Sequence, residues 1–337
     1  MNNNNKIIVH ACSSVLIRPN GIVRYINSVI DLQKKLGHRI IFVTDAKPTQ
    51  IIHTDEVYYV DMNSKYVPKW KDDHVWLDVD GQIVSQISKA YNLLPVKPDM
   101  VLVHDIHSFL GIENLFDDGI FVQHESDVLN LKGRYSYIND DYLQQQVDIV
   151  NNTDWRIGLT VLSEDLSPKR PVYTPVPFTP ITIDTKIKHN GLLYIGDDTD
   201  RKGAKEFMDM AYKLNTVPTV ISHCTTSSVF AHAMVNTFRL DQRQEMYQLM
   251  SHHRVAFIPS KNEGLCLAAL ECLQFMPVIV DSQYPWTRYL KSTGAILATG
   301  NELEDVIRHH MSKDTYDRYL FEIWCQNSIQ YWVNLST

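Results

Sequence analysis

Short runs of apolar, mostly β-branched residues alternate along the chain with longer segments whose apolar residues recur at helical spacing. The first run covers residues 6–10, an amphipathic segment follows at 22–30, and the next run covers 39–44. A strand, a helix and a second strand in this order form a βαβ unit, in which a crossover helix joins two parallel strands. The alternation therefore predicts an α/β fold built on parallel sheets.

The same pattern continues to the end of the chain and predicts further elements. Strands are expected at residues 100–104, 120–124, 158–162, 192–195, 219–221, 255–258 and 278–280. Helices are expected at residues 84–94, 140–150, 204–214, 241–250, 265–275, 302–310 and 315–333. Gly37 is expected to end the first helix as its C′ residue.

Five of the 14 prolines lie between residues 168 and 180. Proline fixes φ and lacks an N–H donor, so this density predicts an extended linker. A chain of 337 residues also suits two domains. The expected organisation is an N-terminal domain at 1–170, a linker at 171–181, a C-terminal domain at 182–315 and a final helix at 316–337.

Composition excludes several classes of protein. No apolar run reaches the ~18 residues of a membrane span, and the first residues lack the apolar stretch of a signal peptide. The five cysteines never form a C-x-x-C pair, which argues against a disulfide scaffold or a structural zinc site. The net charge of −7 excludes a uniformly basic nucleic-acid binder but leaves a local basic patch open. A cytoplasmic protein is expected.

The segment from Pro259 to Glu271 is the strongest candidate for a ligand-binding or catalytic site. Glu263 stands at the exit of an expected strand, and Glu271 follows eight residues later in an expected helix. Gly264 permits close approach of the backbone where that helix begins, and a helix N-terminus offers N–H groups to an anion. The two carboxylates can accept hydrogen bonds from sugar hydroxyls. The alternative is an acid that only complements the helix dipole.

A second polar loop follows the expected strand at 192–195. It begins at Asp197 and ends in the cationic pair Arg201 and Lys202. Two adjacent cations can bind a diphosphate through charge-assisted hydrogen bonds. The alternative is an ordinary solvated turn.

The N-terminal half offers weaker signals. Gly21 opens the first helix and would let a phosphate approach the backbone, but the absence of G-x-G-x-x-G argues against a dinucleotide oxidoreductase. His124 ends an expected strand, where it is either a structural histidine or a ligand contact. His104, Asp105 and His107 follow the preceding strand. Three potential ligands within four residues at a strand end do not usually converge, so we expect no metal site there.

Together these features resemble the retaining GT-B glycosyltransferases that carry an E-x7-E motif, here Glu263 to Glu271. A closer similarity is to the DNA α-glucosyltransferases of T-even bacteriophages and related phage enzymes, which attach glucose or arabinose to 5-hydroxymethylcytosine. The segments that carry this similarity are residues 20–24, 35–38, 121–126, 128–131, 194–196 and 202–203.

The resemblance implies two Rossmann-like domains that face a central cleft, with the C-terminal helix crossing back to the N-terminal domain. The N-terminal domain would bind the DNA acceptor and the C-terminal domain a UDP-sugar donor. The enzyme would act in the cytoplasm of an infected bacterium, without an obligatory metal ion and without a membrane partner.

The resemblance also assigns roles around the donor. The backbone at Gly21 would face the diphosphate. Glu263 would bind sugar hydroxyls, the backbone of Gly264 and Leu265 would neighbour the phosphates, and Glu271 would bind the ribose hydroxyls. Glu263 is one of the two expected catalytic residues.

The other expected catalytic residue is His124, which would contact the donor sugar near the reacting centre. Lys202 would bind the diphosphate. The family usually has an arginine directly after the glycine of the strand-end turn, where this chain has Asp197. Arg201 is expected to supply the cation from the other side of the loop.

An acceptor base within duplex DNA has to be flipped out of the stack to reach such a site. Phosphate contacts would come from a basic patch. The predicted DNA-binding residues are Arg18, Arg24, Lys132 and Arg134, with Lys34, Lys35, Arg39 and the stretch 65–71 as further candidates. Each of them is alternatively a solvated surface charge.

Two other functions stay open at this stage. The same transferase chemistry would serve a glycan, lipid or protein acceptor, and a GT-B chain can also be a nucleotide-sugar epimerase or a sugar-binding module. A transferase for another acceptor would not depend on DNA, which distinguishes it from a DNA glycosyltransferase. An epimerase or a sugar-binding module would need no acceptor at all.

Overall fold

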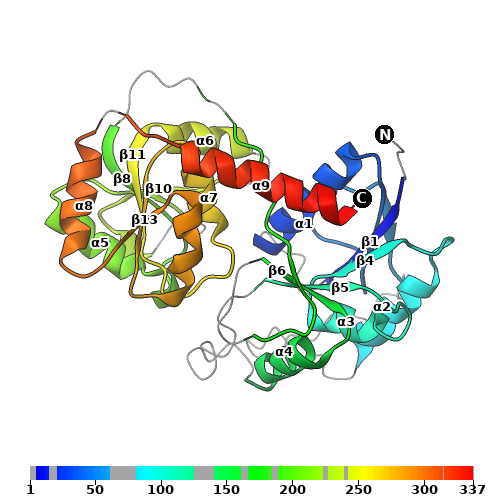
Figure 1. The fold of residues 1–337 in the computed structure, drawn as a ribbon. Helices are drawn as coiled ribbons and strands as arrows, with labels where there is room; N and C mark the ends of the chain where they lie inside the picture. The colour runs from blue at the N-terminus through cyan, green and yellow to red at the C-terminus, as the bar shows by residue number, and fades with distance from the viewer. Residues whose placement is uncertain are drawn as a thin grey trace. The chain divides into compact units, whose positions relative to one another are not determined.

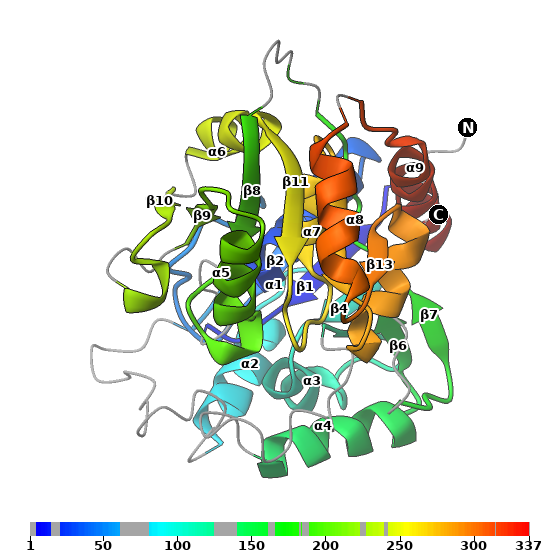
Figure 2. The same ribbon diagram turned by 90° about the vertical axis from the view of Figure 1, so that its left-hand side faces the viewer.

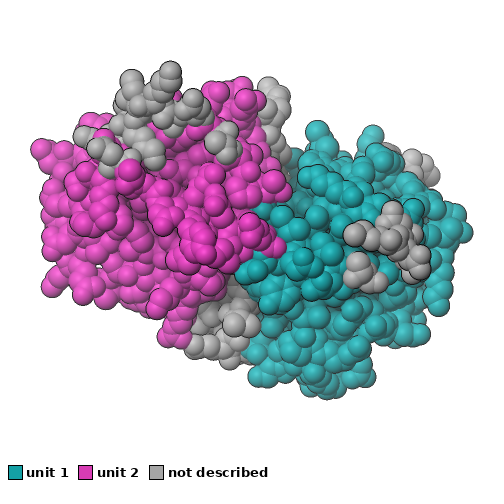
Figure 3. Space-filling model, turned by 45° about the horizontal axis from the view of Figure 1, so that its top comes forward, with its two compact units in different colours: residues 1–178, 327–337 teal, residues 179–326 magenta. Residues whose placement is uncertain are grey.

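The computed structural model describes residues 5–14, 21–60, 81–124, 140–160, 166–181, 183, 189–222, 227–238, 242–313 and 315–336. The chain divides into two compact units, shown in different colours in Figure 3. Unit 1 comprises residues 1–178 and 327–337, and unit 2 comprises residues 179–326. Each unit has its own sheet.

A seven-stranded parallel sheet forms the centre of unit 1 (Figure 1). Its strands are β1 (Ile7–Ala11), β2 (Arg39–Val43), β3 (Glu56–Tyr58), β4 (Met100–Val103), β5 (Ile120–Gln123), β6 (Arg156–Leu159) and β7 (Pro171–Tyr173). They lie in the order β3-β2-β1-β4-β5-β6-β7, and every described pair is parallel. The order changes direction between β1 and β4, which makes their carboxyl ends a topological switch point.

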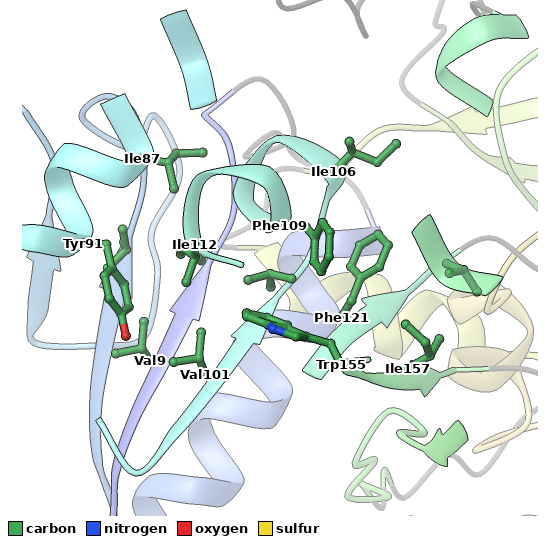
Figure 4. Close-up of a cluster of buried hydrophobic side chains, with 14 of the residues drawn as sticks. Val9, Ile87, Tyr91, Val101, Ile106, Phe109, Ile112, Phe121, Trp155 and Ile157 are labelled. Atoms are coloured by element: carbon green, nitrogen blue, oxygen red, sulfur yellow. The ribbon is translucent and has the colours of Figure 1, made fainter. Parts of the chain in front are cut away.

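One face of this sheet is covered by α2 (Gln82–Asn92), α3 (Ile106–Ile112) and α4 (Asp140–Asn152). Their apolar side chains pack on strand residues such as Val9 and Val101, as Figure 4 shows. Gly119 is required here because a Cβ on it would lie 2.1 Å from the ring of Trp155.

The opposite face is covered by α1 (Gly21–Lys35). Alternate strand residues point to opposite faces, so His10 points toward α1 while Val9 points into the cluster of Figure 4. Gly37 ends α1 in the left-handed region with φ +88, and His38 N donates to Gln33 O. This is the predicted C′ glycine.

Unit 2 is built on a six-stranded parallel sheet in the order β10-β9-β8-β11-β12-β13. Its strands are β8 (His189–Ile195), β9 (Thr219–Ile221), β10 (Met234–Asn236), β11 (His253–Ile258), β12 (Val278–Asp281) and β13 (Ile296–Ala298). Its helices are α5 (Ala204–Lys213), α6 (Arg243–Ser251), α7 (Leu267–Cys272) and α8 (Glu302–Met311), with short 3-10 helices η2 (Asp200–Lys202), η3 (Ser228–Phe230) and η5 (Pro285–Thr293).

The helices α5 and α8 share one face of this sheet, in front of β8 and β11 in Figure 2. Phe207 of α5 and Ile307 of α8 are fully buried in that layer. The strand order reverses between β8 and β11, so the second switch point lies at the carboxyl ends of these two strands. The predicted α/β fold with two Rossmann-like sheets is therefore confirmed.

The proline-rich stretch begins with a strand rather than a linker. Pro171 to Tyr173 form β7, which pairs with β6 at the edge of the sheet. An edge position tolerates Pro171 because one side of the strand needs no ladder donor. Unit 1 then extends to residue 178.

The last helix, α9 (Tyr319–Ser336), belongs to both units. Its residues up to Gln326 belong to unit 2, and the rest belong to unit 1. Trp332 is fully buried, and its Nε1 donates to the Pro175 carbonyl oxygen at 2.6 Å. Within the described part of the chain, no helix is long and apolar enough to span a membrane.

Candidate functional site

Two loops meet at the switch point of unit 2, one after β8 and one after β11. Lys261 N donates to Arg201 O at 2.8 Å, and Ser260 Oγ donates to Lys202 O at 3.5 Å. Gly203 has φ +70, and a Cβ on it would lie 2.3 Å from the Pro259 carbonyl oxygen. The close approach of the two loops therefore depends on this glycine.

The contact brings the cationic pair to the first acid of the E-x7-E motif. Lys202 Nζ lies 2.6 Å from Glu263 Oε1, and Arg201 Nη1 lies 3.6 Å from Glu263 Oε2. Burial alone would raise the pKa of Glu263, but the charges of Lys202 and Arg201 lower it below its usual value. Glu263 is thus an ionised carboxylate between two cations.

A third cation of these loops, Lys261, is held by carboxylates. Lys261 Nζ pairs with Asp200 and lies 2.9 Å from Glu206 Oε1. Burial opposes its charge, yet the hydrogen bonds from Lys261 to these acids raise the pKa of the lysine. Lys261 therefore ties the loop after β11 to η2 and α5.

The second acid of the motif, Glu271, is almost fully buried in α7 with 1% of its surface exposed. Arg243 Nη2 of α6 donates to Glu271 Oε1 at 3.2 Å, and the Tyr247 hydroxyl donates to the same oxygen at 3.4 Å. Arg243 Nε also donates to the Tyr247 hydroxyl oxygen at 2.6 Å. The two acids of the motif thus have different cationic partners.

The helix after Glu263 begins later than predicted. The expected start is residue 265, whereas α7 begins at Leu267, so Gly264 and Leu265 lie in the connecting turn. The Cys266 N–H donates to the Tyr289 hydroxyl at 2.6 Å. Gly264 and Leu265 are partly exposed in this turn, next to Glu263 in the sequence.

Asp197 lies in the turn after β8. Its carbonyl oxygen accepts a hydrogen bond from the Tyr194 hydroxyl at 2.7 Å, which fixes the turn after β8. Arg201 approaches from the other side of the loop, where its Nη1 donates to Asn262 O at 3.0 Å. Arg201 therefore lies beside Glu263, and its role as a replacement for the missing arginine stays a prediction.

In unit 1, three histidines gather at the carboxyl ends of β1, β4 and β5. His10 Nδ1 lies 2.9 Å from His104 Nε2, and His104 Nδ1 lies 3.2 Å from His124 Nε2. His10 Nε2 lies 2.8 Å from Gln33 Oε1 of α1. The ring of Tyr25 stands edge-on to His124 at 4.8 Å between centroids.

Burial keeps these imidazoles neutral. It lowers the pKa of His10 to about 4, against the opposing hydrogen bond with Gln33. It also lowers the pKa of His124 to about 4, although the charge of Asp105 acts in the other direction. For His104, burial and, to a smaller extent, the two neighbouring histidines lower the pKa well below its usual value.

The neighbouring acid, Asp105, has a structural role. It caps α3 by accepting from Ser108 N, and it also accepts from Ser13 N at 2.7 Å. Burial would raise the pKa of Asp105, but contacts that include His107 lower it. Among the described residues, no three His, Cys, Asp or Glu side chains are grouped as metal ligands.

The predicted DNA contacts are only partly described. Arg18, Lys132, Arg134 and the stretch 65–71 lie outside the described residues. Arg24 is half-buried on α1, whose first residue, Gly21, is exposed.

Two of the further basic candidates are paired with acids. Arg39 donates twice to Glu56, at 2.6 and 2.7 Å, and Lys34 Nζ lies 3.2 Å from Asp55 Oδ2. These pairs reduce the positive charge available on this part of unit 1.

Sequence reasoning missed several residues that surround Glu271 in unit 2 and the three histidines in unit 1. Arg243 and Tyr247 lie four residues apart on α6, a spacing that places them on one helix face, but nothing local links them to Glu271. Gln33 is a polar residue on the buried side of α1. A buried glutamine at an apolar position of a helix was the available signal, because buried amides need partners.

No protein-family model matches this sequence, and no curated protein matches it. Solved structures do match. HepE from Anabaena, in complex with UDP and glucose, has a TM-score of 0.69 at 11% identity, with 98% of this chain and 97% of that chain covered. Sucrose-phosphate synthase from Thermosynechococcus elongatus has a TM-score of 0.64 at 13% identity, covering 99% and 95%.

A third similar structure is the trehalose-6-phosphate protein from E. coli bound with UDP-2-fluoro glucose. Its TM-score is 0.64 at 10% identity, and the match covers 98% of this chain and 97% of that one. At such identities the similarity concerns the fold. Two parallel Rossmann-like sheets with this topology give the chain the GT-B fold of these glycosyltransferase structures.

Proposed function

We propose that the protein is a retaining glycosyltransferase that moves glucose or arabinose from a UDP-sugar to the hydroxymethyl group of 5-hydroxymethylcytosine in phage DNA. One observation carries the donor part of this proposal. Lys202 and Arg201 contact Glu263 at the switch point of unit 2, where open α/β sheets bind their ligands. Two similar structures hold UDP with glucose or UDP-2-fluoro glucose.

In the proposed reaction, negative charge grows on the leaving diphosphate while the sugar becomes oxocarbenium-like. Lys202 and Arg201 stabilise that charge, and their positions are set beforehand by Glu263. Glu263 has lone pairs beyond those used by the two cations, and these accept hydrogen bonds from sugar hydroxyls. The acceptor hydroxyl attacks from the face of the departing diphosphate, which takes the proton of that hydroxyl as the bond from the sugar to the diphosphate breaks. No covalent intermediate with the protein forms.

The remaining assignments come from the sequence resemblance. His124 contacts the sugar near the reacting centre, Gly264 and Leu265 offer backbone N–H groups to the phosphates, and Glu271 binds the ribose. Glu271 already accepts hydrogen bonds from Arg243 and Tyr247. A ribose contact would therefore share this carboxylate with two existing donors.

The DNA acceptor is supported by the similarity of residues 20–24, 121–126 and 194–196 to phage DNA glycosyltransferases. Arg18, Arg24, Lys132 and Arg134 would hold phosphates around a flipped base. If a few such contacts drive binding, affinity falls steeply with salt.

The decisive experiment is a transfer assay. The purified chain is incubated with duplex DNA containing 5-hydroxymethylcytosine and with UDP-glucose or UDP-arabinose, and the digested nucleosides are weighed. We expect a hexose or pentose increment on hydroxymethylcytosine. Release of UDP and free sugar without an increment would move the acceptor to a glycan, lipid or protein. No consumption of either donor would overturn the proposal.

A matched pair of variants tests the diphosphate site. Lys202→Met removes the cation beside Glu263, and Lys205→Met removes an exposed lysine three residues away. We expect Lys202→Met to lower turnover at least ~100-fold, because it removes charge stabilisation from the transition state. Lys205→Met is expected to match the wild type. Equal turnover in both variants would contradict the role of Lys202.

A further inference from the structure

Gln33, His10, His104 and His124 form an unbranched chain of hydrogen bonds through unit 1. The three steps measure 2.8, 2.9 and 3.2 Å. Gln33 comes from α1, and the three histidines come from the carboxyl ends of neighbouring strands. The imidazoles of His10 and His104 are stacked, with their planes only 7° apart.

The chain has a polarity, because a neutral imidazole has one donor nitrogen and one acceptor nitrogen. Gln33 Oε1 only accepts, so His10 Nε2 carries the proton and His10 Nδ1 accepts. His104 Nε2 then donates to His10 Nδ1, and His104 Nδ1 accepts. His124 Nε2 donates to His104 Nδ1 in the same way. The lone pair left at the end of the chain belongs to His124 Nδ1.

The surroundings keep the chain neutral. His10 and His104 are fully or almost fully buried, with 0% and 2% of their surface exposed. The ring of Tyr25 makes T-shaped contacts with the rings of His104 and His124. The hydroxyl of Tyr25 is already used as a donor to Thr174 O. Among the described residues, His124 Nδ1 has no hydrogen-bond partner, and the side chain of His124 is partly exposed.

We infer that Gln33, His10 and His104 are positioning residues that hold His124 in the tautomer protonated on Nε2, so that its Nδ1 accepts a hydrogen bond from a hydroxyl group of the substrate. The inference rests on the proposed function only for the identity of that hydroxyl, which belongs to the donor sugar or to the acceptor. It gives His124 a defined chemistry, that of a neutral acceptor.

This chemistry suits a reaction through an oxocarbenium-like state. An imidazolium beside the reacting carbon would repel the positive charge that develops on the sugar. A neutral His124 with its lone pair outward orients a hydroxyl instead, and it does so without a competing charge. The wrong tautomer would present an N–H to the same hydroxyl and lose that orientation.

The direction of the hydrogen bonds in this chain is set by the side-chain amide of Gln33, and an amide can adopt the flipped orientation. If Gln33 presented Nε2 to His10, every proton in the chain would shift and His124 Nδ1 would become a donor. Gln33 Nε2 has no partner among the described residues, so no second contact locks this amide. The tautomer of His124 is therefore the quantity to measure.

The test is ¹⁵N NMR of the full chain, labelled on its histidine rings and free of ligand. The cross-peaks of His124 are identified by their loss in His124→Gln. We expect the Nδ1 shift of His124 in the unprotonated range and the Nε2 shift in the protonated range at pH 7. A protonated Nδ1, or an equal mixture of tautomers, would overturn the inference.

Variants of Gln33 test the origin of the polarity. Gln33→Met keeps the length of the side chain and removes the acceptor, so the tautomers of His124 should mix. Gln33→Glu restores an acceptor and should restore the wild-type spectrum. Gln86→Met is the matched control, because Gln86 is also a buried glutamine on a helix of unit 1. It should leave His124 unchanged, and a His124 spectrum that responds equally to both Met variants would indicate a merely structural effect.

Turnover provides a second readout. With UDP-glucose or UDP-arabinose and hydroxymethylated DNA, Gln33→Met should lower kcat/KM about tenfold, and Gln33→Glu should recover most of the loss. The NMR measurement needs neither donor nor DNA. A correct tautomer without transfer would therefore refute the proposed function alone, whereas transfer with a protonated Nδ1 would refute the inference alone.

Discussion

The histidines of unit 1 show how burial changes a single residue. An imidazole in water has a pKa near 6.5, but in the folded chain burial lowers the pKa of His10 to about 4. The side chain has no exposed surface, and both ring nitrogens have neutral partners. Protonation would place a charge where neither water nor an acid can balance it.

Stability should therefore depend on pH through this residue. Between pH 6.5 and pH 4 the unfolded chain binds a proton at His10 and the folded chain does not, so the free energy of unfolding falls as the pH falls. The loss from His10 alone is about 3 kcal/mol on going from pH 7 to pH 4. Urea unfolding at several pH values measures it.

The variant His10→Gln provides the comparison. It lacks the titrating group, so its unfolding free energy should change less between pH 7 and pH 4 than that of the wild type. Parallel curves for the two proteins would show that His10 does not contribute to the acid sensitivity.

At the scale of elements, the position of the loop after β8 depends on contact with the loop after β11. Gly203 follows η2 in the left-handed region, and its Cα faces the carbonyl group of Pro259 after β11. Both conditions require glycine, the first because of φ and the second because of space. The positions of Arg201 and Lys202, just before Gly203, depend on this packing.

A pair of alanine variants separates the two conditions. In Gly203→Ala the new Cβ has to tolerate a positive φ and also clashes with the Pro259 carbonyl group. In Gly300→Ala it has to tolerate only a positive φ of 51°, because no atom lies within 4 Å. Gly300→Ala should cost about 1–2 kcal/mol of unfolding free energy. Gly203→Ala should cost more and should also weaken binding of UDP, measured by calorimetry. Equal effects on both quantities would contradict the contact between the loops.

At the scale of the whole molecule, the C-terminal helix completes the core of a unit built mostly from the first half of the chain. Trp332 is fully buried in unit 1, near Tyr25 of α1, and donates to the Pro175 carbonyl oxygen. Unit 1 is thus closed by residues more than 150 positions after its last strand, β7. Its folding should require the end of the chain.

Replacing Trp332 tests this dependence. Trp332→Ala removes a large buried side chain and leaves the Pro175 carbonyl without its donor, which should cost about 3–5 kcal/mol of unfolding free energy. Tyr331→Ala, at a neighbouring position with 48% exposure, should cost no more than about 1 kcal/mol. Similar thermal melting of both variants would mean that this part of α9 does not stabilise unit 1.

The sequence by itself predicted the elements that depend on local pattern. The helical spacing of α1, its C′ glycine at Gly37 and most central strands follow from periodicity and backbone preference, which act within one turn or a few residues. Arg201, Lys202 and Glu263 were singled out as well, because they follow strands that begin α/β units, and their role in a donor site stays a prediction. Short elements were missed, among them α3 and the edge strands β3, β7, β10 and β13. The four edge strands are only partly buried, so they lack the buried apolar run that marks central strands of similar length, and α3 has only seven residues.

Only the tertiary structure decided which distant residues meet. His10 and His104 are 94 residues apart, and Arg243 and Glu271 are 28 apart. The first contact follows from the strand order β2-β1-β4, which places strands from separate βα units side by side. The second arises because α6 and α7 both pack against β11. A strand's own residues fix its period and its buried face. Its neighbours are fixed by how the crossover helices cover the whole sheet. The hydrogen-bond chain of the histidines and the pairing of Glu271 with Arg243 therefore arise only in the tertiary structure.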